Sequence, residues 1–299
     1  MAKIFKKLKI NHEVRGYGAL MVIGFLVLFI YSMSLFIPTL WGFITTFKTE
    51  EDLYYNVFGL PERWAFENYM TAFMKMSVTT TGDPRKIYVG EMMLNGVLYA
   101  VGCTFANVFT AAIVAYGCAR FKSKVGNLLH MSVLLVMIIP IIGSGPSEMQ
   151  FVRKLGFYNS IVGMIIMKAN YLGTDFLIYY AAFKGISKDY SDAASIDGAG
   201  NFTIMLQIIF PLISATISTM ALLSFISFWN DSNTPLLYLP NVPNLALGLF
   251  KFNQNSDGDL VSTPMRLTGC FIMFMPVLAI FIVFRKKFML NVNIGGLKG

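Results

Sequence analysis

The sequence of 299 residues carries few charged side chains. Asp, Glu, Lys and Arg make up 13% of the chain, whereas 56% of its residues are apolar. In soluble globular domains roughly a quarter of the residues are charged. The composition therefore excludes an ordinary soluble domain and predicts a protein that is embedded in a lipid bilayer.

Cysteine and histidine are also scarce. The three cysteines, Cys103, Cys118 and Cys270, all lie inside apolar runs, and the two histidines, His12 and His130, are far apart. Metal sites need clustered ligands, and disulfide frameworks need regularly spaced cysteine pairs. The sequence thus predicts no metal site and no disulfide, and it favours cysteines that pack as small apolar residues.

The chain lacks the phosphate-binding pattern G-x-x-x-x-G-K-[ST], and no pairing of a nucleophile with a base recurs on one side of it. We therefore expect that this chain is not an enzyme and that any ATP chemistry comes from a partner. The formal charge of +8 does not indicate nucleic acid either, because Lys and Arg occur in short groups between apolar stretches. Such groups are typical of topology signals in membrane proteins.

Six apolar stretches are long enough to be considered as membrane spans. A helix that crosses the roughly 30 Å hydrocarbon core needs about 20 mainly apolar residues. The stretches are approximately 18–47, which contains Pro38, and 92–119, 128–142, 160–183, 202–229 and 267–284. The first is too long for the apolar part of a signal peptide, so we expect an uncleaved span. The predicted fold is an all-α polytopic membrane protein with six transmembrane helices, in a single domain over 1–299.

The basic residues predict the orientation of these spans. Lys and Arg are concentrated in the amino-terminal tail, in the short loops near 120–124 and 184–188, and after residue 284. On the opposite side, most lie in two long loops, which count for little in the positive-inside rule. Both termini are therefore predicted to be cytoplasmic. The first outer loop contains "WAFENYMTAFMKM", with apolar residues at helical spacing, and there we expect an interfacial helix.

A small polar segment, approximately 184–201, interrupts the apolar pattern on the predicted cytoplasmic side. Ser187 or Ser191 can cap a helix, Asp189 and Asp192 suit the first turn of one, and Gly198 suits its end. The residues favour a short helix across the membrane face, whose alanines would let another protein approach closely. From the residues alone, a merely solvated turn is an equal alternative.

The same segment carries a motif. Asp192, Ala193 and Ala194 are followed after three residues by Gly198, and after nine more by Ile208, with Phe210 and Pro211 next in the pattern. This run resembles the E-A-A-x3-G-x9-I-x-L-P signature of membrane subunits from binding-protein-dependent ABC importers, in the version of the maltose-type sugar permeases. Asp replaces the usual Glu, and Phe replaces Leu.

Further stretches extend the resemblance over most of the chain in matching order. They are "LNGVLYAVGCTFANVFTAAIVAYGCARF" at 94–121, "FVRKLGFYNS" at 151–160, "FISFWNDSNTPLLYLP" at 225–240 and "NVNIGGLKG" at the carboxyl end. The resemblance implies a type I importer transmembrane domain, with core helices over about 92–286, located in a bacterial inner or plasma membrane.

The resemblance also implies partners and site residues. A second permease subunit, two ATPase subunits that hold ATP and Mg²⁺, an extracytoplasmic sugar-binding protein and the carbohydrate itself are implied, with no cofactor on this chain. ATPase closure would drive alternating access. The residues implied to couple to the ATPases are Asp192, Ala193, Ala194, Asp197 and Gly198, with an added carboxyl-terminal contact by Gly295, Gly296, Lys298 and Gly299.

A substrate pathway is predicted from the charges within the apolar stretches. Lys168 and Asp175 are seven residues apart in the expected span 160–183, which places them on one helix face with Tyr171, near Asn170. Charges in the membrane are costly and usually face protein or water. An internal ion pair, or a Lys168 that reaches the outer surface, is the alternative. Trp229 and Asn230 form a second candidate patch, although an aromatic residue at the interface is often only an anchor.

A different class of transporter is also compatible with charged residues in the spans. In an ion-coupled secondary transporter of a small polar solute, Lys168 and Asp175 would form an ion relay. Such transporters are commonly built from inverted repeats with broken helices in both halves. The sequence contains no matching second copy, and this favours the importer.

Overall fold

The structure is a computed structural model that describes residues 14–82, 84–121, 123–139, 143–254 and 262–289. Nearly all of its regular structure is helical. The first elements are α2 (Val14–Thr45), α3 (Glu50–Tyr55), α4 (Glu67–Lys75), β1 (Ser77–Thr79), β2 (Lys86–Tyr88), α5 (Val89–Arg120), α6 (Lys124–Ile138), α7 (Gly145–Lys154), α8 (Ile161–Lys168) and α9 (Thr174–Gly185). They are followed by α10 (Asp189–Ile196), α11 (Asn201–Thr203), the π-helical η2 (Ile204–Ile209), α12 (Phe210–Leu212), α13 (Ser214–Trp229), α14 (Asn233–Tyr238), α15 (Leu245–Gln254) and α16 (Thr263–Met289).

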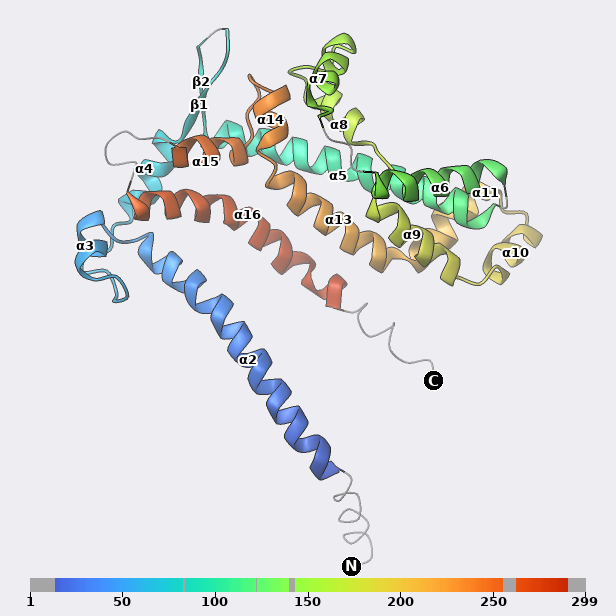
Figure 1. The fold of residues 1–299 in the computed structure, drawn as a ribbon, viewed down its shortest axis with the longest axis horizontal. Coiled ribbons are helices and arrows are strands. Elements are labelled where there is room, and N and C mark those ends of the chain that lie inside the picture. Colours follow the sequence, from blue (N-terminus) through green and yellow to red (C-terminus); the bar gives the residue numbers. More distant parts are fainter. Residues whose placement is uncertain (1–13, 83, 122, 140–142, 255–261, 290–299) are drawn as a thin grey trace, which may run out of the picture.

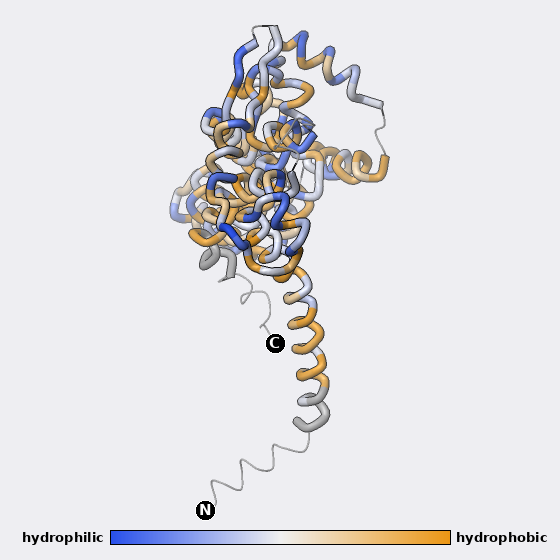
Figure 2. The backbone as a smooth tube through the Cα atoms, turned by 90° about the vertical axis from the view of Figure 1, so that its left-hand side faces the viewer, coloured by the Kyte–Doolittle hydropathy of each residue, from blue (hydrophilic) through white to orange (hydrophobic). Residues whose placement is uncertain are grey.

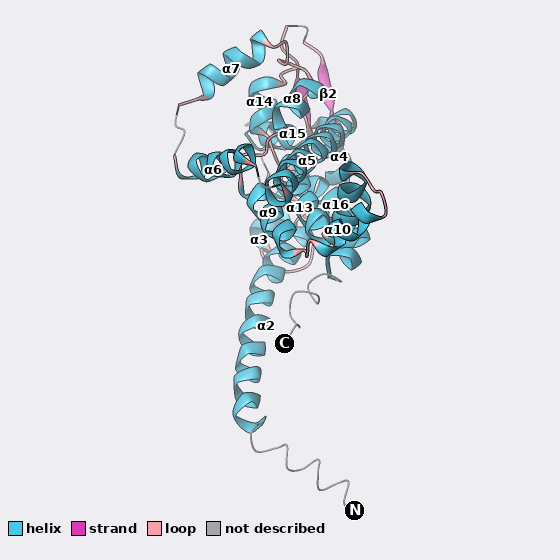
Figure 3. Ribbon diagram, turned by 90° about the vertical axis from the view of Figure 1, so that its right-hand side faces the viewer, coloured by secondary structure: helices cyan, strands magenta, loops and turns pink. Residues whose placement is uncertain are grey.

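One antiparallel hairpin departs from the all-α prediction. In it β1 pairs with β2, with Val78 opposite Ile87. Both of these side chains are buried, together with Met76 and Val89, against α4 and α15. The strands project from the helical body on the side opposite to α2 (Figure 3).

Within the described residues, three helices are long and apolar enough to cross a membrane without interruption. They are Leu20–Thr45 within α2, Val89–Arg120 and Thr263–Val283 within α16. They agree with the first, second and sixth predicted spans to within a few residues. The third prediction, 128–142, corresponds to α6, which has 15 residues and a length of about 22 Å. Part of that predicted stretch lies outside the described residues.

The fourth predicted span is wrong as one continuous helix. The chain from Ala169 to Gly173 is not helical, and it separates α8 from α9. Here the side-chain Oδ1 of Asn170 accepts a hydrogen bond from the backbone N–H of Leu172, at 2.8 Å. This local turn competes with the helical pattern, and Gly173 adds a fully extended backbone with φ 170°.

The fifth predicted span is bent rather than straight. The segment Asn201–Leu212 meets Ser214–Trp229 at an angle of 80°. Pro211 lies just before the bend, and its ring lacks an N–H and clashes with the carbonyl of the preceding turn. The chain absorbs this in the π-helical η2 directly upstream. If the bent pair is one span, the described residues contain up to four spans.

The long helix α5 is the centre of the bundle. It packs most extensively against α9, α13 and α8, in the arrangement that Figure 1 shows. Large aromatic side chains fill these contacts: Tyr116 on α5 packs edge to face against Phe183 on α9, with ring centroids 5.4 Å apart. One end of this bundle contains Val89 and the hairpin, and the other contains Arg120 and α10.

By contrast, α2 extends away from the bundle. None of its residues 20–40 is buried, and its colouring in Figure 2 is mainly hydrophobic. A network of hydrogen bonds attaches the end of α2 to the rest of the protein. Asn68 on α4 donates to the backbone oxygens of Thr46 and Lys48, both at 2.8 Å. Lys48 is fully buried and donates to the backbone oxygen of Asn56.

A helix, α4, lies within the stretch for which an interfacial helix is predicted, and its position at the membrane interface stays a prediction. In its described residues, the predicted outer loop after α13 is more ordered than its Pro, Asn and Gly content suggests. Asp231 organises its start, because its carboxylate accepts hydrogen bonds from the Tyr99 hydroxyl at 2.8 Å and from the Thr234 N–H at 2.9 Å. Asn244 then donates to the backbone oxygen of Asp231 at 2.8 Å.

Candidate functional site

The polar segment between α9 and η2 folds into the short helix α10. Asp189 and Asp192 lie in its first turn, where the positive end of the helix dipole favours carboxylates. The N-cap position is Lys188, without a side-chain cap, so the predicted serine cap is not formed. Ser187 precedes it, and its Oγ accepts from the Asp189 N–H at 3.2 Å and donates to the Asp189 carboxylate at 2.8 Å. The alternative cap, Ser191, lies inside the helix instead.

Gly198 terminates α10 in a left-handed conformation, with φ +85°. The Ala199 N–H donates to the Ala194 oxygen at 2.9 Å, and the Gly198 N–H donates to the Ser195 oxygen at 3.1 Å. This pair of bonds is the Schellman motif, which needs a residue with positive φ and is therefore usually closed by glycine. The spacing from Ala194 to Gly198 in the motif is thus explained by the backbone, because the turn that ends α10 requires a positive φ at Gly198.

The two faces of α10 differ sharply. Ala194 is 7% exposed and belongs to the apolar core that continues through Ile204 and Ile209. Asp192 and Ala193 are exposed, and Ile196 is 86% exposed. The inward face of α10 is thus anchored by one small side chain. Its outward face presents a carboxylate, a methyl group and an apolar side chain, and it forms a short surface that another molecule can contact.

The position of α10 is at the extreme of the bundle, beyond the ends of α5 and α9 (Figure 1). Asp192, Ala193 and Gly198 are exposed there, and Asp197 is exposed beside them. The carboxyl-terminal residues Gly295, Gly296, Lys298 and Gly299 lie outside the described residues, so their predicted ATPase contact stays a prediction.

The predicted pathway residues are distributed differently from the expectation. Lys168 ends α8 and Asp175 lies in the first turn of α9, so the two do not share a helix face. They also form no ion pair with each other, both being within the described part of the chain. Asn170 lies exposed in the break, and Tyr171 packs its ring 6.3 Å from that of Phe176.

The break is held by a residue that sequence reasoning missed. Asn107 on α5 donates from its side-chain nitrogen to the backbone oxygen of Asn170 at 3.4 Å, and its oxygen accepts from Ser224 on α13 at 3.4 Å. Non-helical backbone at membrane depth is tolerated where it is buried in protein or lines water. Asn107 therefore marks the one point where α5, the break and α13 share polar contacts among the described residues. An amide in the middle of an otherwise apolar helix was the signal.

Trp229 is a packing residue in this structure. It is 2% exposed, stacks on Phe225 with ring centroids 5.9 Å apart, and donates from its indole nitrogen to the Met273 oxygen at 3.1 Å. The structure gives no support to a sugar contact by this ring. Asn230 is exposed, but its side chain donates to the Ile226 oxygen of its own helix.

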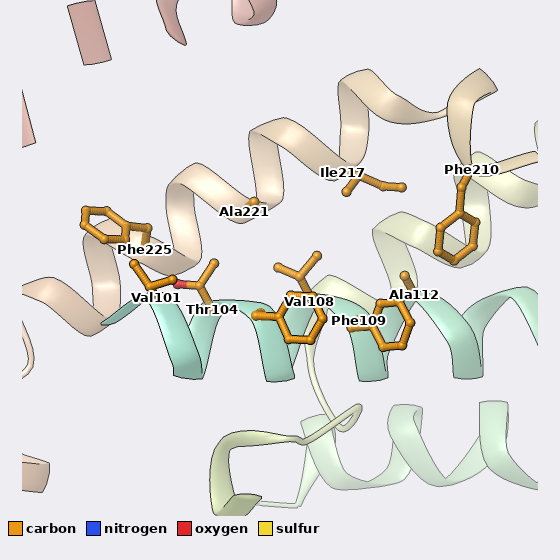
Figure 4. A pocket seen from close by; sticks show the side chains of 10 residues that line it. Val101, Thr104, Val108, Phe109, Ala112, Phe210, Ile217, Ala221 and Phe225 are labelled. Atoms are coloured by element: carbon orange, nitrogen blue, oxygen red, sulfur yellow. The ribbon is translucent and has the colours of Figure 1, made fainter. Parts of the chain in front are cut away.

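An apolar cavity of about 360 Å³ lies between α5 and α13 (Figure 4). Its walls include Phe105, Val108 and Phe225, and the buried hydroxyl of Thr104 has no hydrogen-bond partner among the residues that the structure describes. Sugar hydroxyls need several hydrogen-bonding groups. None of the predicted pathway residues lines this cavity, whereas Asn170 belongs to the polar cluster at Asn107.

Residues 107–288 match the family model of the binding-protein-dependent transport system inner membrane component. The chain belongs to this family. It is accordingly a multi-pass inner membrane component of a transport system, in agreement with its long apolar helices.

Curated relatives cover nearly the whole chain. A probable ABC transporter permease protein, YurM of Bacillus subtilis, is 25% identical over 276 residues, which are 91% of this chain and 87% of that protein. The diacetylchitobiose uptake system permease protein NgcG of Streptomyces coelicolor is 23% identical over 90% of this chain and 86% of its own length. The melibiose/raffinose/stachyose import permease protein MelC of Bacillus subtilis is 23% identical over 88% and 92%.

A solved structure has the same fold. It is a chain of a bacterial ABC transporter involved in the import of the acidic polysaccharide alginate, with a TM-score of 0.72. At 18% sequence identity the two superpose over 92% of this chain and 98% of that one. The predicted architecture of an ABC importer permease is therefore confirmed at the level of the fold.

Proposed function

We propose that this chain is one of two permease subunits in an ATP-driven, binding-protein-dependent importer of oligosaccharides. The proposal combines the family membership with the names of relatives, among them NgcG for diacetylchitobiose and MelC for melibiose, raffinose and stachyose. The second subunit, two ATPases and an extracytoplasmic sugar-binding protein complete the assembly, and both termini of this chain are cytoplasmic.

The observation that carries the proposal is the form of α10. It is a short helix at one end of the bundle, anchored by Ala194, with Asp192 and Ala193 facing outward and a fixed glycine turn at Gly198. Such a helix can enter a cleft on another protein as a rigid unit. The chain itself has no phosphate-binding loop, so ATP and Mg²⁺ are bound by the partner ATPases.

The mechanism follows from how α10 is attached. When the ATPases close around ATP, they displace α10, which is packed on η2 and thereby connected to α13. The 80° bend before α13 and the break before α9 are the places where the bundle can change shape with least loss of helical hydrogen bonds. In the proposed mechanism, alternating access results from movement at this bend and at this break.

The substrate would pass the polar cluster at the break. Asn107, Asn170, Ser224 and Asp175 offer amide, hydroxyl and carboxylate groups that hydrogen-bond to sugar hydroxyls. Lys168 and Tyr171 flank the same break and remain proposed pathway residues. An ion relay between Lys168 and Asp175 is disfavoured, because the two groups lie on separate helices and form no pair.

The experiment that tests the proposal is co-purification with candidate ATPase subunits in the same membranes. Ala193→Tyr replaces a small exposed residue of α10 by a bulky one, and it is expected to abolish ATPase association and ATP-dependent uptake without lowering membrane abundance. Lys124→Tyr is the matched control, since Lys124 is exposed at the same end of the bundle but belongs to α6 and not to α10.

Uptake is measured with a panel of radiolabelled oligosaccharides that includes diacetylchitobiose and raffinose. Normal ATPase association by Ala193→Tyr, or saccharide uptake without any nucleotide, would contradict the proposal.

A further inference from the structure

The guanidinium of Arg120 is incompletely bonded at the point where α5 ends. Its Nη1 donates to the backbone oxygen of Ser187, just ahead of α10, at 3.5 Å. Its Nε and Nη2 are buried and have no hydrogen-bond partner within the described residues. A guanidinium has five N–H donors in a fixed fork, and buried donors are normally satisfied. In this conformation, Nε and Nη2 of Arg120 therefore lack the acceptors that buried donors normally have.

Acceptors lie across a small polar cavity. The cavity has a volume of about 210 Å³ and separates the end of α5 from α10, with Arg120 on one side and Ser191, Asp192 and Ser195 on the other. The Ser191 hydroxyl is also buried and also has no partner in the part of the chain that the structure describes. Arg120 of α5 and the polar side chains of α10 thus line the same cavity, and among the described residues no hydrogen bond joins Arg120 to Ser191, Asp192 or Ser195 across it.

Two connections link α10 to the bundle: one consists of apolar packing and the other of a hydrogen bond. The apolar one runs from Ala194 and Ala199 to η2, the π-helical segment that leads into the 80° bend. The polar one runs through Arg120 directly to α5, the helix with the most extensive packing in the bundle. One turn before Arg120, Tyr116 packs against Phe183 and Phe210, which fixes the end of α5 to α9 and α12.

We infer that Arg120 is a positioning residue for coupling, which transmits the displacement of α10 to α5. This inference rests on the proposed function. When α10 is pressed toward the bundle, the cavity narrows, and the free donors of Arg120 reach the Ser191 hydroxyl and the Asp192 carboxylate. The fork of an arginine matches a carboxylate with two parallel hydrogen bonds, which a lysine does not reproduce. Once these hydrogen bonds form, α10 and α5 move together as one rigid unit.

The test measures how much saccharide is moved for each ATP hydrolysed, in vesicles that contain the complete transporter. The variants are Arg120→Gln, Arg120→Lys and Ser191→Ala, with Lys124→Gln as the control that removes a cation from the same end of the bundle. The probe is the radiolabelled oligosaccharide of the panel that the wild type takes up. Membrane abundance, ATPase association and ATPase rate are measured in the same samples.

Arg120→Gln is expected to keep ATPase association and to lower the ratio of transported saccharide to hydrolysed ATP by about fivefold or more. Arg120→Lys should recover only part of this ratio, and Ser191→Ala should lower it in the same direction, while Lys124→Gln matches the wild type. A wild-type ratio for Arg120→Gln would overturn the inference. So would loss of Arg120→Gln from the membrane together with a wild-type ratio for Ser191→Ala. If the wild type fails to bind any ATPase, the proposed function fails instead.

Discussion

Replacing Gly198 by alanine perturbs one backbone angle and little else. A β-carbon at Gly198 would meet no atom within 4 Å, so no clash is introduced. Its φ of +85° is nevertheless unfavourable for alanine, by about 1–2 kcal/mol. When α10 is not docked to a partner, its exposed carboxyl end can change conformation and so relieve this strain. In the proposed docking, a cleft on an ATPase accepts only the ordered turn, and the strain therefore lowers the affinity of the complex.

The expected result is therefore a weaker complex with an unchanged amount of permease in the membrane. A cost of about 1–2 kcal/mol corresponds to an affinity that is roughly 5- to 30-fold lower. Titration of purified ATPase onto permease in nanodiscs measures this affinity. Gly198→Asn should lose less, because asparagine tolerates the left-handed region better than alanine.

Gly200 offers a matched control two residues away. A β-carbon there also meets nothing within 4 Å, but its φ is −73°, which alanine adopts freely. Gly200→Ala should bind the ATPase like the wild type. Equal affinities for Gly198→Ala and Gly200→Ala would refute the reasoning, because the two variants differ in backbone strain and not in side-chain volume.

Three further predictions concern the bundle. Trp229→Ala should lower the free energy of unfolding by about 3–5 kcal/mol, since the ring is 2% exposed, and should leave the order of preference among saccharides unchanged in uptake assays. Tyr99→Phe leaves the Asp231 carboxylate without the hydroxyl at 2.8 Å and should cost about 1–3 kcal/mol in thermal unfolding, whereas Tyr88→Phe, at an exposed ring, should not. Asp175→Asn should raise the KM for uptake about tenfold if the carboxylate binds a sugar hydroxyl, and an unchanged KM would remove Asp175 from the pathway.

The elements that sequence reasoning located well are those with local causes. The short helix α10 follows from its two early aspartates, its alanines and its terminal glycine, all within ten residues of each other. The long helix α5 follows from an unbroken apolar run, and its observed bounds differ from the predicted ones by a few residues.

The misses have non-local or competing causes. Hydrophobicity alone does not reveal that the Asn170 side chain closes a turn and breaks a span. The burial of Trp229 depends on Met273, which lies 44 residues away in the sequence. In the same way, Asn159 donates from its backbone to the Tyr238 oxygen at 2.7 Å, and this contact joins two motifs that only the folded chain brings together.

The central claim is that α10 lies on the cytoplasmic face and is covered by an ATPase. It is tested most directly with Ile196→Cys, at the most exposed large side chain of α10, in a chain whose three cysteines have been replaced by serine or alanine. A membrane-impermeant maleimide should label this cysteine in inside-out vesicles but not in right-side-out vesicles, and bound ATPase should protect it. Labelling from the outside would contradict the account, as would labelling that bound ATPase does not reduce.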